Sequence, residues 1–254
     1  MRLILIIFFI FNYSNSQNLP VKKLYGSLSD RKNVIFDVDF WTFTANADSV
    51  INSTGFTIAN EKSECVKAIS INDLKSVEFL PEKIFKRFPN LVTFDAEKCA
   101  IKSIGRENFR ELSKLVRLNL NGNQLSVIKP PAFDDLQSLK FLHLNQNKIK
   151  KIDGNSFKNL KNLQSLSLSH NRLTILHINT FDNLTELRNI SLDFNRLNSI
   201  ADRHFEFNKK LEFIWMANND IKHFSYTMFN YMTNLKFVDF SFNQMLTDFV
   251  YEKN

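Results

Sequence analysis

Histidine and cysteine are the side chains of this chain that would most readily supply a nucleophile, a general base or a metal ligand. The five histidines lack the short, regular spacing of metal ligands, and neither cysteine has a histidine at an equivalent position. The five glycines are equally scattered, and neither Gly-x-Ser-x-Gly nor a phosphate-binding glycine loop occurs. We therefore expect no catalytic residue, no metal site, no cofactor and no enzymatic activity.

Asparagine is the polar residue that recurs regularly in this sequence. Cys99 occupies the same position one period before the first of these asparagines. An asparagine amide offers two donors and an acceptor, so it can pair with main-chain groups that a sharp turn leaves without sheet partners. We expect a structural column with one member per turn of a repeated unit. Its asparagines follow one another at intervals of 24 residues: Asn123, Asn147, Asn171, Asn195, Asn219 and Asn243.

Apolar residues share this period and indicate the elements that hold the column. An apolar pair two residues apart precedes each asparagine, as in Leu118/Leu120, and predicts a short strand because alternate strand residues face opposite sides. One unit reads L-x-x-L-x-L-x-x-N-x-L-x-x-I-x-x-x-x-F-x-x-L. Recurrent phenylalanines explain part of the high Phe content of 26 residues, and we expect them to fill the outer half of each unit: Phe109, Phe133, Phe157, Phe181, Phe205 and Phe229.

This pattern resembles the leucine-rich repeat in its 24-residue extracellular type, from about Phe88 to the C-terminus. The resemblance implies an α/β-type solenoid, a right-handed horseshoe with a parallel β-sheet on its concave face. A single coil cannot bury its own apolar face, so the stacking of coils creates the core. We expect the solenoid over residues 67–254, with about seven to eight repeats and the last one incomplete.

The N-terminal 16 residues have the pattern of a secretory signal peptide. Arg2 precedes the apolar run Leu3–Phe11, and small Ser14 and Ser16 follow. We expect cleavage after Ser16 and a secreted, extracellular product. Residues 17–66 then form an N-terminal cap, whose strand at Val34–Phe43 covers the open edge of the first repeat.

Aromatic side chains interrupt a concave face that is otherwise small and polar. On each expected strand, the residues that flank the inward pair face solvent, and exposed aromatic side chains are typical of protein interfaces. The alternative is that the tail around Phe249–Tyr251 folds over these aromatic residues as a lid. The predicted ligand-binding residues are Phe141, His143, Phe213, Trp215, Phe237 and Asp239.

The C-terminal end and the two cysteines leave alternatives open. The last repeat stops before its phenylalanine and lacks a cysteine-rich cap. Either Leu246–Tyr251 folds back as a minimal lid, or the exposed end pairs with a second molecule and forms a homodimer, or the gene product is truncated. We expect Cys65 and Cys99 at opposite ends of the sheet, farther apart than the Cα limit of about 7 Å for a disulfide.

Charge and glycosylation motifs bear on the partners. The net charge of +7 is spread along the chain, which favours an ordinary solvated surface, and a secreted chain is not expected to bind nucleic acid. Anionic glycans are a weaker possibility at the basic residues Lys148, Lys150, Lys151, Lys158 and Lys161. Glycosylation is expected at three Asn-x-Ser/Thr motifs: Asn52, Asn183 and Asn189.

The function predicted from the sequence is that of a secreted, non-enzymatic module that binds an extracellular protein ligand or receptor through its concave face. The resemblance extends to Toll-type ectodomains and small secreted leucine-rich repeat proteins, which implies a role in innate recognition or extracellular signalling. The alternative is a structural matrix protein that self-associates or binds glycans.

Overall fold

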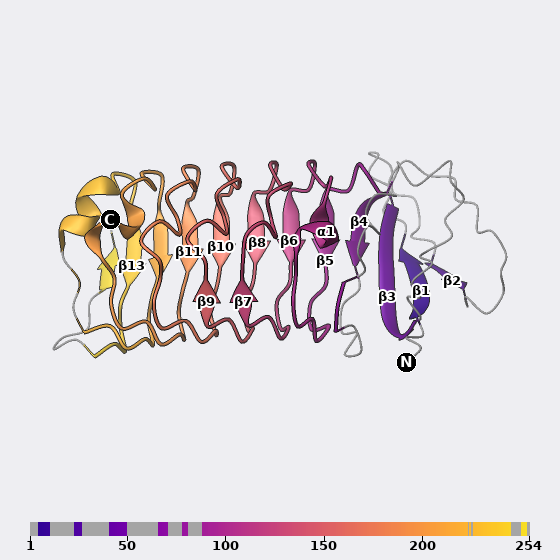
Figure 1. Ribbon diagram of the computed structural model, residues 1–254, viewed down its shortest axis with the longest axis horizontal. Helices are drawn as coiled ribbons and strands as arrows, with labels where there is room; N and C mark the ends of the chain where they lie inside the picture. The colour runs from indigo at the N-terminus through magenta and orange to yellow at the C-terminus, as the bar shows by residue number, and fades with distance from the viewer. Residues whose placement is uncertain are drawn as a thin grey trace.

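The computed structural model describes residues 5–10, 23–26, 41–49, 66–70, 78–80, 88–222, 224, 226–244 and 250–252. Twelve of the described strands form one sheet, along which the chain advances one coil at a time (Figure 1). Its order is β14-β13-β12-β11-β10-β8-β6-β5-β4-β3-β1-β2. The fold is therefore the predicted solenoid of stacked coils along a parallel sheet.

The repeat strands are short, parallel and in register at the predicted period. Leu118 lies opposite Leu142, and Leu166 lies opposite Ile190. In each of these strands the central residue is buried against the core, whereas its neighbours are turned to the other side of the sheet. The strands are β4 (Val66–Ser70), β5 (Thr93–Asp95), β6 (Arg117–Asn119), β8 (Phe141–His143), β10 (Ser165–Ser167), β11 (Asn189–Ser191), β12 (Phe213–Trp215) and β13 (Phe237–Asp239).

The return segments of the coils contain little regular structure. Two of them pair as a small second sheet, β7 (Val127–Ile128) with β9 (Lys151–Ile152). Three short helical segments occur in others: α1 (Arg106–Phe109), η3 (Asp202–Phe205) and η4 (Tyr226–Tyr231). The sheet thus supplies the regular platform, and the returns close the coils behind it.

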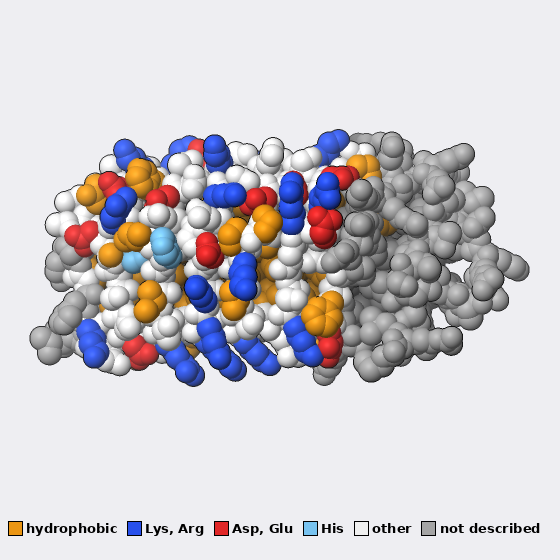
Figure 2. Space-filling model, in the orientation of Figure 1, with side chains coloured by type: hydrophobic (Ala, Val, Ile, Leu, Met, Phe, Trp, Pro, Cys, Tyr) orange, Lys and Arg blue, Asp and Glu red, His pale blue; other side chains and the backbone are white. Residues whose placement is uncertain are grey.

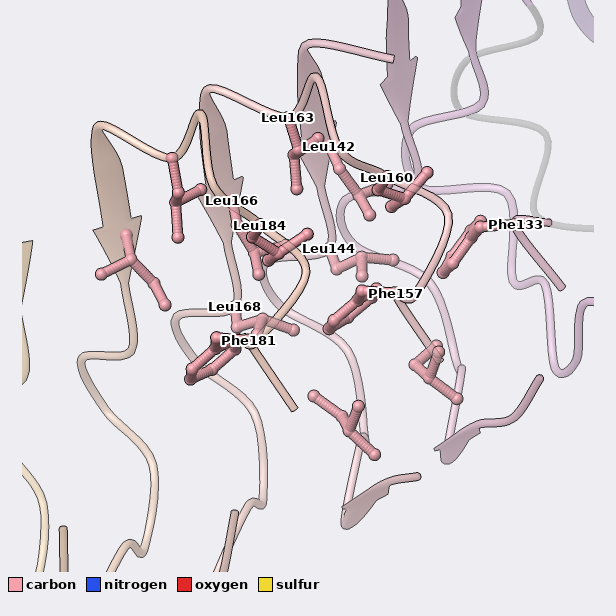
Figure 3. Close-up of a cluster of buried hydrophobic side chains, with 14 of the residues drawn as sticks. Phe133, Leu142, Leu144, Phe157, Leu160, Leu163, Leu166, Leu168, Phe181 and Leu184 are labelled. Carbon is pink, nitrogen blue, oxygen red and sulfur yellow. The ribbon is translucent and has the colours of Figure 1, made fainter. Parts of the chain in front are cut away.

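The core consists of leucines from the strands and phenylalanines from the returns, packed coil against coil (Figure 3). The ring centroids of Phe109 and Phe133 lie 6.1 Å apart, those of Phe133 and Phe157 6.0 Å, and those of Phe181 and Phe205 5.5 Å. All five phenylalanines are buried. The predicted role of the phenylalanine column is confirmed for these coils.

The column changes in the next coil, where the sequence prediction for Phe229 is wrong. Phe229 is only half-buried, and the preceding Met228 is fully buried in its place. Both residues belong to the 3₁₀ helix η4, which has six residues, whereas the 3₁₀ helix η3 of the preceding coil has four and keeps Phe205 buried. Phe224 also contributes to the core here, with its ring stacked on that of Phe240 at 4.6 Å.

The asparagine column lies where the strands end and the chain turns. In Asn171, Nδ2 donates to the carbonyl oxygens of Leu144 and Leu168, both at 2.9 Å, and Oδ1 accepts the N–H of Ile149 at 3.0 Å. The equivalent asparagines repeat this set in every coil from Asn123 to Asn243. Each amide therefore joins its own turn to the turn of the preceding coil, as its donors and acceptor predicted.

Cys99 takes the corresponding place in the first complete coil. Its side chain is buried, its N–H donates to Asn123 Oδ1 at 3.1 Å, and its thiol lies 3.3 Å from the carbonyl oxygen of Glu97. Cys65 lies outside the described residues, so the expected separation of the two thiols stays a prediction.

Strands other than repeat strands lie at both ends of the sheet. Strand β3 (Trp41–Ser49) runs parallel to β4 and covers its edge, and β1 (Leu5–Ile10) and β2 (Lys23–Gly26) continue the sheet in antiparallel fashion. Of the cap strand predicted at Val34–Phe43, residues 41–43 belong to β3, and residues 34–40 lie outside the described part. The predicted signal peptide contains β1.

The last described strand, β14 (Val250–Glu252), pairs antiparallel with β13, placing Tyr251 opposite Val238. The tail thus covers the edge of the last repeat strand in the plane of the sheet. Of the open alternatives, this arrangement corresponds to a strand that folds back. The edge of β13, one of the places where a second molecule could pair in the homodimer alternative, is occupied by β14 of the chain itself.

Candidate functional site

The side of the sheet turned away from the core, here called the sheet face, carries the residues that flank the buried strand centres. On strands β5, β8, β10, β11, β12 and β13 these flanking residues are half-buried, with their central neighbours fully covered. The sheet face is thus a continuous surface whose composition can vary without disturbing the core.

Three aromatic side chains from two adjacent strands meet on the sheet face, as the sequence predicted. The rings of Phe213 and Trp215 on β12 are stacked with centroids 5.7 Å apart and planes inclined by 9°. The ring of Trp215 lies 6.1 Å from that of Phe237 on β13, at 45°. The cluster formed by Phe213, Trp215 and Phe237 is called the aromatic cluster below.

Charged residues border the aromatic cluster at the start of the strands. The Nζ of Lys236 lies 5.8 Å from the centre of the Phe213 ring, a cation–π distance. The carboxylate of Glu212 binds Lys236 at 2.6 Å and Arg188 at 2.5 Å. Hydrogen bonds from Lys236 and Arg188 lower the pKa of Glu212. This network spans three coils and fixes the cation beside Phe213.

Phe141 and His143, predicted as part of the same site, lie apart from the aromatic cluster. They belong to β8, and β10 and β11 separate β8 from β12 in the sheet. At about 4.8 Å per strand, the two groups are about 14 Å apart. Burial lowers the pKa of His143, and the nearby charge of Arg117 adds to the effect. The predicted residues therefore form two areas, joined by the polar strands between them.

The side chain of Asp239 contacts the main chain of its own strand end. Its Oδ1 accepts the N–H of Ser241 at 2.8 Å, at the end of β13. Asn119 makes the same contact with the N–H of Asn121, at 3.1 Å. Asp239 thus stabilises the strand end and retains its second carboxylate oxygen for other contacts.

A second polar column, which sequence reasoning missed, crosses the middle of the sheet face. Asp193 Oδ2 accepts the hydroxyl groups of Ser191 and Ser169 at 3.1 and 3.3 Å, and these two hydroxyls also contact each other. Asp193 Oδ1 accepts the N–H of Ala217 at 3.0 Å. Burial raises the pKa of Asp193, against the effect of these hydrogen bonds. Small residues spaced 24 apart on this face were the available signal.

The backbone at the strand ends also escaped sequence reasoning. The residue just before each member of the asparagine column has a positive φ, and a bulky side chain at positive φ is unfavourable. Two of these positions hold a phenylalanine that is exposed, Phe194 at 48% and Phe242 at 71%. The column comprises Lys98, Gly122, Gln146, His170, Phe194, Asn218 and Phe242, with φ between 52° and 67°.

The glycosylation motifs fall on different surfaces. Asn183 is exposed on a return segment, shortly after buried Phe181. Asn189 is half-buried at the start of β11, directly opposite Phe213 of the aromatic cluster. A glycan on Asn189 would therefore occupy the sheet face beside Phe213. Asn52 lies outside the described residues, and modification of all three stays a prediction.

The described residues also bear on metal binding and on membrane insertion. They contain no group of three or more His, Cys, Asp or Glu side chains arranged to hold a metal ion. None of their helices has the length and hydrophobicity needed to cross a membrane.

Comparison with known proteins defines the class of this fold. A leucine-rich repeat family model matches residues 89–149, 138–197 and 185–245, which together make up more than half of the chain. The chain belongs to the leucine-rich repeat family. No curated protein matches it in sequence.

Solved structures agree with this assignment at the level of the fold. The crystal structure of a TLR13–ssRNA13 complex matches with a TM-score of 0.71 and 23% sequence identity, over 80% of this chain. The match covers only 28% of the TLR13 chain. The shared feature is the solenoid, and a likeness at this identity carries no residue-level assignment.

Proposed function

We propose that this chain is a non-enzymatic recognition module that binds another protein through the aromatic cluster on its sheet face. The observation that carries the proposal is the contact of Phe213, Trp215 and Phe237 on the outer side of β12 and β13, where the core does not require them. Large rings in mutual contact offer much apolar area with little entropy left to lose on binding.

The position of the C-terminal strand supports this proposal over the lid alternative. Strand β14 adds to the edge of β13 through main-chain pairing, with Val250 opposite Asp239 and Glu252 opposite Phe237. A strand in the plane of the sheet extends the sheet face instead of lying across it. The paired part of the tail therefore leaves the space above the aromatic cluster to a partner.

The test combines binding and stability measurements on Trp215→Ala. Secreted and cell-surface proteins captured by the wild-type chain are identified, and the binding of each purified candidate is then measured directly. We expect Trp215→Ala to abolish binding with a small change in melting temperature. Ile175→Ala, which truncates a 64% exposed side chain on a return segment, is the matched control and should bind normally.

Two results would contradict the proposal. Binding that survives Trp215→Ala unchanged would place the interface elsewhere. A large loss of stability in the same variant would show that the aromatic cluster is internal packing, as the lid alternative requires.

We further propose that the chain is secreted and acts in extracellular or innate recognition. The apolar run Leu3–Phe11 after Arg2 supports secretion, and similarity to a Toll-like receptor fold supports the recognition role. Expression in cultured animal cells, with N-terminal sequencing of protein from the medium, tests the first part. A product that begins at Gln17 supports it, and an uncleaved cell-bound product contradicts it.

RNA is a ligand to consider because the similar TLR13 structure is a complex with ssRNA. Asp239 lies on β13 two residues after Phe237 of the aromatic cluster, and an acidic group there disfavours a phosphate backbone. We therefore retain protein as the proposed ligand of this face. Titration with a labelled single-stranded RNA, using Trp215→Ala as the comparison, would reveal an RNA site if binding were lost in the variant.

A further inference from the structure

A basic column runs along the edge of the solenoid where the strands end. Lys148, Arg172 and Arg196 each follow a member of the asparagine column, one coil apart, and all three are exposed. Their main chains are held in the stack, since the N–H of Arg172 donates to Ile149 and that of Arg196 to Leu173, both at 2.8 Å. Successive cations therefore start from backbone positions about 4.8 Å apart.

These cations are not used by the fold. Across the described residues, ion pairs involve many of the other lysines and arginines, but neither Arg172 nor Arg196 has an acidic partner there. Lys148 donates only to the neutral amide of Gln124, at 3.1 Å. Asp220 ends the column in the next coil, where Gln244 donates to its carboxylate at 3.1 Å.

Aromatic rings flank the basic column on one side. His170 and Phe194, two residues before Arg172 and Arg196, are exposed and stack with ring centroids 4.2 Å apart and planes inclined by 8°. Both lie at positive φ, where Gly122 and Asn218 of the same column show that smaller residues fit. A bulky ring at such a position indicates that the exposed ring itself has a role, such as contact with a ligand.

The edge at which the repeat strands end can be followed in Figures 1 and 2. Strands β6, β8, β10 and β11 run toward the lower edge of Figure 1, where the chain turns. A row of Lys and Arg side chains lines the same lower edge in the space-filling view (Figure 2). The aromatic cluster lies within β12 and β13, whereas the basic column follows the ends of the strands.

We propose that Lys148, Arg172, Arg196 and the His170–Phe194 pair form a binding site for a sulfated glycan chain. Guanidinium groups bind sulfate in a bidentate manner, and a single file of cations suits a stiff polymer with closely spaced charges. The flanking rings supply an apolar surface against which the C–H face of a sugar can pack. This site is separate from the proposed protein interface and shares Lys148 with the basic cluster predicted from the sequence.

The geometry favours a glycan over single-stranded nucleic acid. Nucleic acid sites of this type need aromatic faces on which bases stack. His170 and Phe194 already cover each other's facing ring surfaces, so a base could enter between them only by separating the pair. A sugar needs no such insertion.

The basic residues predicted from sequence alone divide differently in the structure. Lys158 pairs with Asp134 at 3.4 Å on a return segment, and Lys161 lies three residues further along the same return. Lys151 lies in β9, and Lys150 directly precedes it. Linear spacing grouped lysines of one coil, whereas stacking brings together cations of successive coils.

The test is the binding of a heparin-derived hexasaccharide, measured by calorimetry at several salt concentrations. We expect Arg172→Ala/Arg196→Ala to weaken binding at least tenfold and to reduce its salt dependence, with unchanged melting behaviour. Lys158→Ala/Lys161→Ala removes the same charge elsewhere and should change affinity less than about twofold. Asp220→Asn should strengthen binding, because it removes the acid that ends the column.

Comparison ligands decide between sources of negative charge. Desulfated hexasaccharide should not bind, and single-stranded oligo(dT) of matched charge should bind more weakly than the sulfated sugar. Equal loss in both double variants would show nonspecific attraction and overturn the proposal. Tighter binding of oligo(dT), lost in the Arg172/Arg196 variant, would overturn it in favour of nucleic acid.

Discussion

Asp193 Oδ1 accepts the main-chain N–H of Ala217 from the next coil at 3.0 Å. Asparagine makes the same contact in earlier coils, since Asn121 Oδ1 accepts the N–H of Asn145 at 2.8 Å and Asn145 Oδ1 that of Ser169 at 3.0 Å. A neutral amide oxygen thus fills a role that Asp193 fills with a carboxylate. Because burial raises the pKa of Asp193, the folded chain disfavours the charged form of this carboxyl more than the unfolded chain does.

Asp193→Asn should therefore leave the fold intact and make it equally or slightly more stable at pH 7. The raised pKa means that folded protein holds its proton to higher pH than unfolded protein. The corresponding stability is present below the ordinary aspartate pKa and is lost as pH rises through the folded value. We expect a gain of no more than about 1 kcal/mol at pH 7, since solvent screens this partly exposed group.

Thermal unfolding of wild type and Asp193→Asn at pH 3.5 and pH 7 checks this expectation. The difference between the two proteins should be small at the acidic pH and should favour the variant at the neutral one. Asp239→Asn, at a strand end on the same face, is the control for the same change of charge and shape. A variant less stable at pH 7 than at pH 3.5, relative to wild type, would show that the charge itself is useful.

The asparagine column predicts a graded loss of stability along the solenoid. Asn171→Ala removes two donors and one acceptor from buried main-chain partners and should cost about 1–3 kcal/mol. Asn243→Ala should cost less, because Asn243 is half-buried at the end of the repeats and water can replace its amide. Urea unfolding of both variants gives the comparison, and equal losses would contradict it.

Periodic features were predictable because each is repeated in several coils. Asn171 and Phe157 each have a residue of the same type 24 positions before and 24 positions after. A residue type that recurs at this spacing therefore indicates the same environment for every member of its column. The prediction for Phe229 was wrong because Met228, in the 3₁₀ helix η4, takes the buried position. A local change of this kind leaves the 24-residue period of the sequence unaltered.

Within the candidate site, features that follow from the sequence pattern were likewise predicted, and features that depend on local backbone or on contacts between coils were missed. The aromatic cluster was found because strand alternation assigns Phe213 and Trp215 to one face. Phe194 was missed because its exposure depends on a positive φ, which hydrophobic spacing does not report. The bond from Asp193 to Ala217 depends on contact between successive coils, and such contacts appear only once the coils are stacked.

The phenylalanine column gives a contrast between two substitutions of the same kind. Phe157→Ala should cost about 3–5 kcal/mol, because the ring is buried and stacks on Phe133 at 6.0 Å. Phe229→Ala should cost clearly less, since its ring is half-buried beside Phe224. Calorimetric unfolding of both proteins measures the difference. Equal losses would mean that Phe229 is packed like the earlier members.

His143 should make stability depend on pH in the mildly acidic range. Burial and Arg117 lower its pKa, so unfolded protein binds a proton at a pH where the folded protein does not. Stability should therefore fall as pH decreases through the ordinary histidine value of about 6.5. His143→Gln should flatten the curve of melting temperature against pH between about 5 and 7. An unchanged slope would show that His143 does not cause the pH dependence.

Phe194→Gly separates the effect of the exposed ring on ligand binding from its effect on the free energy of unfolding. Glycine relieves the left-handed backbone cost of about 1–2 kcal/mol, which stabilises the variant. The variant also loses the stacking with His170, about 0.5–1.5 kcal/mol, and its unfolded chain gains entropy, and both effects destabilise it. These effects nearly cancel, so unfolding should change by less than about 1 kcal/mol. Gln146→Gly, at the same position two coils earlier, relieves the backbone without removing a ring and should be neutral to stabilising. If Phe194 serves the glycan site, its loss must weaken hexasaccharide binding, whereas Gln146→Gly must not. A loss of several kcal/mol in Phe194→Gly would instead mean that the exposed ring belongs to the packing of the fold, and the argument from its backbone conformation would fail with it.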